Sequence, residues 1–280
     1  MQGKTVVITG ATSGIGEVAA LRLAGKGARI VLVARDKRRA EAMLDRLRTA
    51  GLGIEHRVHY GDLSRLSEMK RLAAGIALAE PKIDVLINNA GALFNNRQLT
   101  EDGLEYTFAT NHAAYHVLTL GLEQSLRTAG RARVVNTASG AHRGAKLDFD
   151  DLQSAKSYSG FKVYSRSKLC NILWTRELAK RWAGTGITVN CLHPGFVATR
   201  FGDQSGGFLQ PLFGVAKIFA ISPEKGAETI IHLASAPEVA DVSGGYFYKS
   251  RPAMPTREAQ DEATARRLWD ETVKLTGVDL

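Results

Sequence analysis

Short runs of β-branched and other apolar residues alternate along this chain with longer segments of helical periodicity. Strands separated by helices must return to the sheet through βαβ crossovers, so this alternation predicts a parallel sheet. Several runs are apolar almost throughout, which indicates that helices cover both faces of that sheet. We expect strands at 5–9, 28–34, 54–60, 82–88, 133–138 and 187–192.

The alternation is interrupted once. Residues 200–222 lose the periodicity and are interpreted as an inserted loop with short helical pieces, within a substrate lid at about 196–222. Because no linker rich in proline, glycine or serine divides the chain, residues 1–280 are predicted to form one doubly wound α/β domain. After the loop we expect a helix with Ser222 as N-cap and Pro223 in its first turn that runs to about Ala234, a strand at 244–248 and a terminal helix at 256–275.

Composition restricts the possible settings of this domain. The apolar fraction of 44% and the charged fraction of 23% are ordinary for a globular protein. Cys170 and Cys191 are the only cysteines and lie in apolar segments, so we expect buried thiols rather than a disulfide framework, and no metal site. The first strand is expected to begin near Lys4, which leaves no room for a signal peptide, and no apolar run reaches about 18 residues. The sequence therefore predicts a cytoplasmic protein without a membrane span.

A net charge of +9 raises the question of nucleic-acid binding. Basic residues gather at Arg35, Lys37, Arg38 and Arg39. From Asp36 onward, however, they share a helical pattern with apolar residues, which is typical of a solvated outer helix face. We therefore expect no nucleic-acid partner.

A glycine-rich turn follows the first expected strand. The order is Gly10-x-x-x-Gly14-x-Gly16, and a helix begins directly after it. Glycines allow the backbone to approach a pyrophosphate closely, and the amides of a helix N-terminus stabilise its anionic oxygens. An ordinary tight turn is the alternative. The position between a strand and a helix favours a dinucleotide site.

The end of the second expected strand bears on which dinucleotide is bound. Arg35 suits the 2′-phosphate of NADP, whereas Asp36 is also a natural N-cap for the next helix. We therefore expect NADP(H), with NAD less favoured. Asp62 would accept from the adenine amino group or serve as a turn residue. The amides of Asn88-Asn89-Ala90-Gly91 would either bond the cofactor or clamp neighbouring loops.

Tyr164 and Lys168 lie four residues apart in a predicted helix, so they share one face. A lysine ammonium about 4 Å away would lower the pKa of a tyrosine toward neutrality, as a general base requires. Such a pair also occurs by chance on exposed helices. Ser139 follows the fifth expected strand and would lie at the same sheet edge, where its hydroxyl would hold a substrate oxygen or simply form a turn.

With these residues in place, the chain resembles the short-chain dehydrogenase/reductase family over nearly its whole length. The matching motifs are Thr9-Gly10-x-x-x-Gly14-x-Gly16, Asn88-Asn89-Ala90-Gly91, Asn111, Ser139, Tyr164-x-x-x-Lys168 and Pro194-Gly195. The resemblance implies a Rossmann-type fold and four catalytic residues, Asn111, Ser139, Tyr164 and Lys168. It implies a cofactor site made of Gly10, Ser13, Gly14, Ile15, Gly16, Arg35, Asp62, Leu63, Asn89, Ala90, Gly91, Tyr164, Lys168, Pro194, Gly195, Val197 and Thr199.

In this family pattern Tyr164 is the general acid/base, Lys168 lowers its pKa and holds the nicotinamide ribose, and Ser139 orients the substrate oxygen. Asn111 would hold a water that links Lys168 to solvent, or would be a helix residue bonded to a neighbouring loop. The resemblance therefore implies an NADP(H)-dependent oxidoreductase that transfers hydride between nicotinamide and an alcohol or carbonyl.

Within the family, the segments from Asp151 to Leu169 and from Leu192 to Gly195 are similar to the retinol dehydrogenase-like group. Those relatives are commonly anchored in a membrane at the N-terminus. No such anchor is expected here, so a soluble bacterial-type relative is the better comparison and a retinoid substrate is less favoured.

The expected lid carries many aromatic and aliphatic residues, and Leu93-Phe94 follows the Asn88 turn. We predict an apolar substrate pocket, unless these aromatics form a small core of their own, face another subunit or contact a membrane surface. His142 would line this pocket or, more simply, be a surface histidine. Two other functions stay open, reduction of a conjugated C=C bond and a non-catalytic NADP(H)-binding regulator. The resemblance also implies a homodimer or homotetramer.

Overall fold

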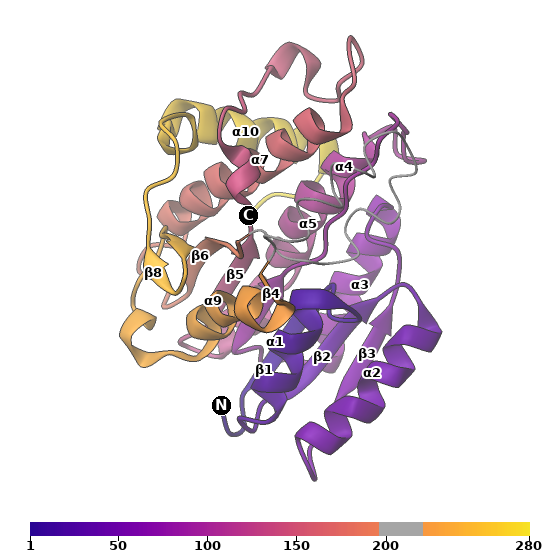
Figure 1. Cartoon of the computed structure of the whole chain (residues 1–280), viewed down its shortest axis with the longest axis vertical. Helices are drawn as coiled ribbons and strands as arrows, with labels where there is room; N and C mark the ends of the chain where they lie inside the picture. Colours follow the sequence, from indigo (N-terminus) through magenta and orange to yellow (C-terminus); the bar gives the residue numbers. More distant parts are fainter. Residues whose placement is uncertain (196–220) are drawn as a thin grey trace.

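One sheet forms the centre of the computed structural model, which describes residues 1–195 and 221–280 (Figure 1). Its strand order is β3-β2-β1-β4-β5-β6-β7-β8, with β1 to β7 mutually parallel and β8 antiparallel to β7. This confirms the predicted doubly wound parallel α/β fold. The strands are β1 (Thr5–Thr9), β2 (Arg29–Ala34), β3 (Arg57–Tyr60), β4 (Val85–Asn88), β5 (Arg133–Thr137), β6 (Thr188–His193), β7 (Tyr246–Tyr248) and β8 (Arg251–Pro252).

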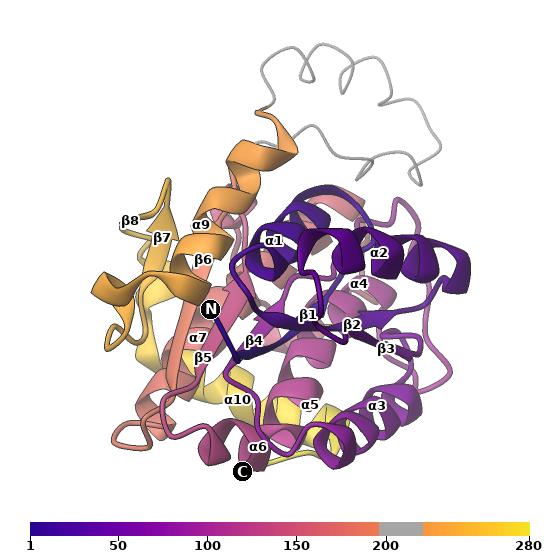
Figure 2. The same ribbon diagram turned by 90° about the horizontal axis from the view of Figure 1, so that it is seen from below.

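Helices cover both faces of the sheet, as Figure 2 shows in a view along its edge. Apolar side chains seal each interface, and the two faces have separate apolar cores. One face carries α1 (Gly14–Ala24), α2 (Lys37–Ala50) and α9 (Pro223–Ser235). The other carries α3 (Leu66–Ala79), α4 (Tyr106–Phe108), α5 (Ala114–Gly121), α6 (Glu123–Thr128), α7 (Gly160–Arg181) and α10 (Glu262–Thr276).

Side-chain caps fix several helix starts where the sequence predicts them. Asp36 accepts a hydrogen bond from the Arg39 amide at 2.9 Å, which confirms it as the N-cap of α2. Ser222 caps α9 in the same way, and Pro223 occupies the first turn. The terminal helix begins later than expected, because Asp261 caps it by accepting from the Thr264 amide.

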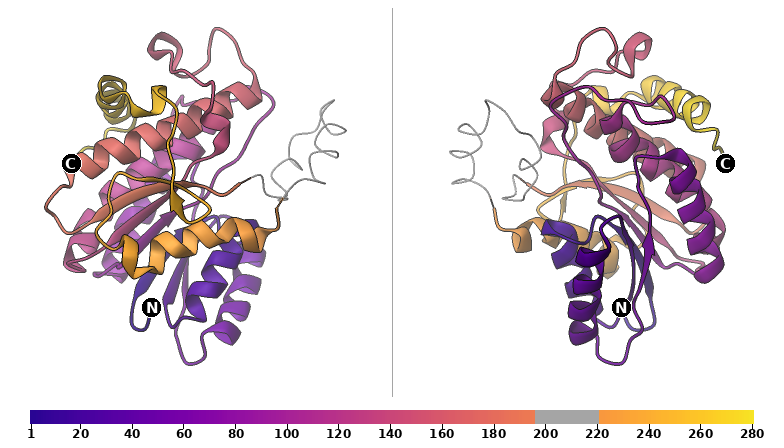
Figure 3. Two further views of the ribbon diagram at one scale, coloured as in Figure 1. Left: turned by 60° about the vertical axis from the view of Figure 1, so that its left-hand side comes forward. Right: turned by 90° about the vertical axis from the view of Figure 1, so that its right-hand side faces the viewer.

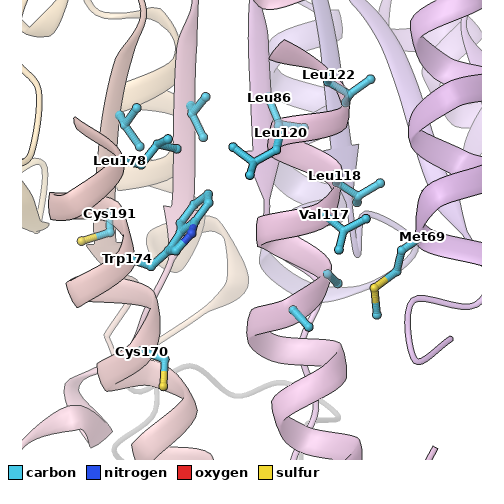
Figure 4. Close-up of a cluster of buried hydrophobic side chains, with 14 of the residues drawn as sticks. Met69, Leu86, Val117, Leu118, Leu120, Leu122, Cys170, Trp174, Leu178 and Cys191 are labelled. Carbon is cyan, nitrogen blue, oxygen red and sulfur yellow. The ribbon is translucent and has the colours of Figure 1, made fainter. Parts of the chain in front are cut away.

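The core between the sheet and the α5 and α7 helices is close-packed (Figure 4). Val117 and Leu118 of α5 pack toward Met69 of α3 in this cluster. Cys170 and Cys191 are both fully buried here, and burial raises the pKa of each thiol to about 12. Buried, protonated thiols confirm the prediction that both cysteines are packing residues.

Helix α10 lies on the outer side of α7 (Figure 3). The Trp269 indole stacks on Trp174 with centroids 6.2 Å apart, and the Arg181 guanidinium lies 4.2 Å from the Trp269 ring centroid. Beyond the helix, the Val278 carbonyl bonds His116 at 2.8 Å. The end of the described chain therefore forms part of the core on this face. No helix in residues 1–195 and 221–280 is long and apolar enough to cross a membrane.

Candidate active site

The predicted site residues gather at the edge where the parallel strands end. Thr9 closes β1, Asn88 closes β4, Thr137 closes β5 and His193 closes β6. The loops that follow these four neighbouring strands carry the glycine turn, the Asn89 turn, Ser139 and Pro194-Gly195. This edge is the common ligand-binding position of doubly wound sheets.

The glycine turn is shaped so that only glycine fits. Gly10 has a φ of +67°, and a Cβ there would lie 2.7 Å from the Ala90 Cα. A Cβ on Gly16 would lie 2.3 Å from the Gly10 carbonyl oxygen. Ser13 stands at the N-cap of α1 but makes no side-chain capping bond, so Gly14 and Ile15 begin the helix without one. The turn and helix start thus form a backbone cradle that fits a pyrophosphate.

The Asn89 turn clamps the glycine loop. The Thr9 hydroxyl accepts from the amides of Asn89 and Ala90, each at 2.9 Å. The Asn89 side-chain amide donates back to the carbonyls of Thr9 and Gly10, at 3.3 and 3.1 Å. Of the two roles left open for this motif, the structure shows the clamping role. Gly91 adjoins the catalytic candidates, since a Cβ there would lie 3.3 Å from the Lys168 Nζ.

Arg35 and Asp62 face each other at the ends of β2 and β3. The Arg35 guanidinium lies 3.6 Å from Asp62 and is 63% exposed, which leaves it accessible to a ligand. Asp62 also accepts from the amide and hydroxyl of Ser64, as a turn residue does. Leu63, between them, is partly buried against the core. Asp36 does not compete for a ribose because its carboxylate caps α2.

Tyr164 is a partly buried residue of α7, near its N-terminal end. Burial raises the pKa of its hydroxyl to about 12, and a side-chain hydrogen bond with Ser139 opposes that rise. The expectation that Lys168 lowers the pKa of Tyr164 toward neutrality is therefore wrong for this structure, because burial disfavours the phenolate more strongly. Tyr164 thus holds its proton at neutral pH and contacts the Ser139 side chain.

Lys168 is only 2% exposed, one turn further along α7. Its ammonium donates to the Thr137 carbonyl at 3.0 Å and lies 5.5 Å from the Tyr164 ring centroid. Burial lowers the pKa of Lys168 to about 7. The predicted sharing of one helix face by Tyr164 and Lys168 is confirmed.

Asn111 lies in a single π-helical turn, Ala109–Ala113, between α4 and α5. Its side-chain amide bonds both the amide and the carbonyl of Ala92, at 2.8 and 2.9 Å, and also donates to the Ser167 hydroxyl at 3.0 Å. The structure therefore shows Asn111 bonded to a neighbouring loop. A π-turn inserted into a helix is frequently found at functional sites.

Sequence reasoning missed several polar residues of this site. Tyr115 is buried beside Lys168, and its hydroxyl donates to the Ala90 carbonyl at 2.9 Å. The Thr137 carbonyl holds Lys168. His142, expected either to line the pocket or to be a surface histidine, is fully buried, and its ring bonds Ser139 and Thr256. The sequence signal for such residues is a tyrosine or histidine among apolar neighbours. Their hydrogen-bond partners are distant in sequence, so this signal does not identify them.

Pro194 and Gly195 are partly buried beside the end of β6, and Gly195 has a φ of +94°. Val197, Thr199 and nearly all of the expected lid at 196–222 lie outside the described residues. The lid, its aromatic residues and its proposed pocket therefore stay predictions.

Comparison with known proteins identifies the family. Residues 4–207 match the short chain dehydrogenase family. Human retinol dehydrogenases 14 and 13 are 41% and 39% identical to the chain over 99% of its length, which spans 88% and 86% of theirs. An uncharacterized protein from Mycobacterium paratuberculosis has a solved structure with 31% identity and a TM-score of 0.80, over 99% of this chain and 95% of that one.

The match covers the glycine turn, the Asn89 turn, Ser139 and the Tyr164 and Lys168 pair, which the fold brings to one edge. Proteins of this family use a nicotinamide dinucleotide, and the backbone cradle between β1 and α1 fits its pyrophosphate. The chain belongs to the short-chain dehydrogenase family of oxidoreductases.

Proposed function

We propose that this protein is an NADP(H)-dependent oxidoreductase that interconverts an apolar alcohol and the corresponding carbonyl compound. The observation that carries the proposal is the meeting of three groups at one sheet edge. The Tyr164 hydroxyl bonds the Ser139 side chain, and the Lys168 ammonium lies one helical turn away over the Tyr164 ring. A phenol, a hydroxyl and a cation placed together can transfer a proton to or from a substrate oxygen and stabilise the charge that develops on it.

Tyr164 is the proposed general acid/base. With a pKa raised to about 12 it carries its proton at neutral pH, so it is prepared to donate that proton to a carbonyl oxygen. The Ser139 hydroxyl would donate a second hydrogen bond to the same oxygen. A bound nicotinamide would supply the hydride. Reduction of a carbonyl uses this protonated form as the acid, and oxidation of an alcohol uses the phenolate as the base.

Lys168 is proposed to bind the cofactor ribose and to supply positive charge at the site. Its anchor on the Thr137 carbonyl fixes the ammonium behind Tyr164, and the missing Cβ of Gly91 leaves it space on the cofactor side. Asn111, fixed to Ala92 and Ser167, is proposed to hold a water that exchanges protons between Lys168 and solvent. The remaining cofactor contacts follow from the family motifs.

NADP(H) is the proposed cofactor because of the residues at the ends of β2 and β3. Arg35 presents an exposed guanidinium suited to a 2′-phosphate, and the carboxylate of Asp36 is occupied as a helix cap. Asp62 would turn from Arg35 toward the adenine amino group when the phosphate takes its place. These contacts favour the phosphorylated dinucleotide over NAD.

An apolar, retinoid-like substrate is supported by the relatives, several of which are named retinol dehydrogenases. Among the described residues, Leu93 is buried beside the site, whereas Phe94 packs edge-to-face on Tyr106 with centroids 4.9 Å apart. Phe94 therefore supports the loop that follows the Asn89 turn.

A cytoplasmic location and a homo-oligomer are also proposed. Sedimentation of the purified protein would test the proposed oligomer.

The test is consumption of NADPH with a panel of apolar aldehydes, ketones and enones. We expect turnover of aldehydes or ketones, and a loss of about 10³-fold in kcat in Tyr164→Phe because the proton donor is removed. Tyr158→Phe is the matched control, since the Tyr158 hydroxyl bonds the Phe94 carbonyl instead. NADPH binding, followed by fluorescence, should persist in both variants. Full turnover in Tyr164→Phe would exclude the proposed acid/base.

A further inference from the structure

One imidazole nitrogen receives two backbone amides at the edge of the site. The Nδ1 atom of His193, the last residue of β6, accepts from the Gly140 amide at 2.9 Å and from the Gly195 amide at 3.2 Å. Gly140 directly follows Ser139, and Gly195 belongs to the loop after β6 that the family motif assigns to the cofactor. A single side chain therefore joins the substrate-side loop to the cofactor-side loop.

The ring of His193 is held in place for this role. It stacks on Tyr248 of β7 with centroids 4.8 Å apart and planes 16° from parallel. Gly140 also approaches the ring closely, since a Cβ there would come within 2.9 Å of the His193 Nε2. Burial, with smaller contributions from His142 and Arg143, lowers the pKa of His193 to about 4. The ring is therefore neutral at physiological pH, and its Nδ1 stays an acceptor.

A second histidine holds the other end of the same peptide group. The His142 Nδ1 lies 2.7 Å from the Ser139 carbonyl oxygen, and its Nε2 accepts from the Thr256 amide at 3.3 Å. Because Nε2 is the acceptor, the ring proton is on Nδ1 and is donated to Ser139. Tyr246 of β7 packs edge-on against the ring, with centroids 5.4 Å apart.

The Ser139 carbonyl and the Gly140 N–H are the two ends of one peptide plane. His142 binds the oxygen of that plane and His193 binds its nitrogen. A displacement of this peptide would carry the adjoining Ser139 Cα with it and shift the Ser139 hydroxyl relative to Tyr164. Hydrogen bonds to both ends of the peptide resist such a displacement.

We propose that His193 and His142 are positioning residues that clamp the Ser139–Gly140 peptide, aim the Ser139 hydroxyl at the substrate oxygen and, through Gly195, set the distance between the substrate and cofactor loops. The proposal rests on the proposed function in that Ser139 must touch substrate. Neither histidine exchanges a proton with substrate in this role. Their effect is on geometry, where a displacement of about 1 Å costs on the order of 10²-fold in rate.

The test compares two replacements at each histidine. His193→Asn keeps an acceptor oxygen near the position of Nδ1, whereas His193→Leu removes it. His142→Asn likewise keeps a donor for the Ser139 carbonyl, and His142→Leu does not. We expect each leucine variant to lose about 30- to 100-fold in kcat with a smaller change in KM, and each asparagine variant to stay within about 5-fold of wild type.

Hydrogen exchange of the Gly140 and Gly195 amides, measured by NMR, gives a readout that needs no turnover. Both amides should lose protection in His193→Leu and keep it in His193→Asn. The proposal is overturned if both amides stay protected in His193→Leu, or if they lose protection while kcat is unchanged. It is also overturned if asparagine and leucine are equally harmful. A wild-type protein that consumes no NADPH would contradict the proposed function alone, since the amide exchange still tests the clamp.

Discussion

The two faces of the sheet build their shares of the site by different means. On the α1 face the core is apolar, and the pyrophosphate cradle is made by backbone at Gly10 and Gly16. On the α7 face, polar side chains are buried among the apolar ones. Asn88 bonds Asn136 and Thr119, and Asn136 bonds Thr175, each at 2.9 Å and each fully buried. The cofactor side is thus shaped by closely approaching backbone, and the catalytic side by buried, hydrogen-bonded side chains.

This difference has an energetic counterpart. A glycine turn needs little more than space, whereas a buried polar group is costly unless it is bonded. The catalytic face carries three such buried groups, Lys168, His112 and His116. Burial lowers the pKa of Lys168 to about 7, that of His112 to about 3 and that of His116 to about 4. We expect substitutions on this face to separate activity from stability and those on the α1 face to lower both together.

The largest effect is expected for Lys168→Met. Turnover should fall by more than about 10³-fold because the cation behind Tyr164 is lost. The free energy of unfolding should nevertheless rise by about 2 kcal/mol at pH 7, since burial disfavours the charged lysine and methionine fills similar space. The Thr137 carbonyl keeps the Asn171 amide at 3.4 Å as a partner. Activity assays and urea unfolding measure the two quantities.

The pH dependence of this stability gain sharpens the prediction. The pKa of Lys168 falls from 10.5 to about 7 on folding, so the unfolded chain binds more protons between these values. Wild-type stability should therefore rise with pH across this window. The advantage of Lys168→Met should be greatest at and below pH 7 and vanish near the ordinary lysine pKa. If the stability difference between Lys168→Met and wild type were constant with pH, burial would not disfavour the charged form of Lys168.

A smaller effect is expected for Gly16→Ala on the other face. The added Cβ would lie 2.5 Å from the Asn89 Nδ2 as well as against the Gly10 carbonyl, so the clamp on the glycine loop must shift. We expect a loss of about 100-fold in NADPH affinity and about 1 to 3 kcal/mol in stability. Fluorescence titration and urea unfolding measure these losses.

Gly75→Ala is the matched control for this substitution. Gly75 lies inside α3, and a Cβ there meets no atom within 4 Å. This variant should gain about 0.5 to 1 kcal/mol with unchanged NADPH binding, because alanine is the better helix former. If the two alanine variants changed NADPH binding and stability alike, the short contacts around Gly16 would not explain why glycine is required there.

The smallest effect is expected for Arg35→Ala. Removing the guanidinium should weaken NADPH binding about 10-fold and leave NADH binding nearly unchanged, because NADH has no 2′-phosphate. Lys37→Ala controls for general charge, since Lys37 is an exposed neighbour that pairs with Glu41. Equal losses for both cofactors in Arg35→Ala would remove the basis for NADP(H) preference.

Most of the fold could be predicted from the sequence because each strand and helix is encoded locally. The strand expected at 54–60 is shorter, Arg57–Tyr60, since the Ile30 amide of β2 bonds the His56 side chain rather than a strand carbonyl. Strand β8 has only two residues, too few to give a periodic signal. Such differences arise where a tertiary contact ends an element.

The site could be predicted only in part for the same reason. The glycine spacing and the Tyr164 and Lys168 pair are local patterns, and the structure brings them to one edge. His193 and Gly140 are 53 residues apart, and His112 and Thr272 are 160 apart, so neither contact leaves a trace in spacing. The pKa direction of Tyr164 was mispredicted because its burial depends on the assembled fold.

The packing of α10 has a consequence for how the protein is made. Thr272 and Val278 bond His112 and His116, in and just after the π-turn that carries Asn111. During synthesis at about 5 to 20 residues per second, the glycine turn and its helices emerge from the ribosome first. The catalytic face cannot close until the segment through Val278 has also emerged. A nascent chain would therefore complete the α1 face, whose last helix α9 ends at Ser235, before it could complete the catalytic face.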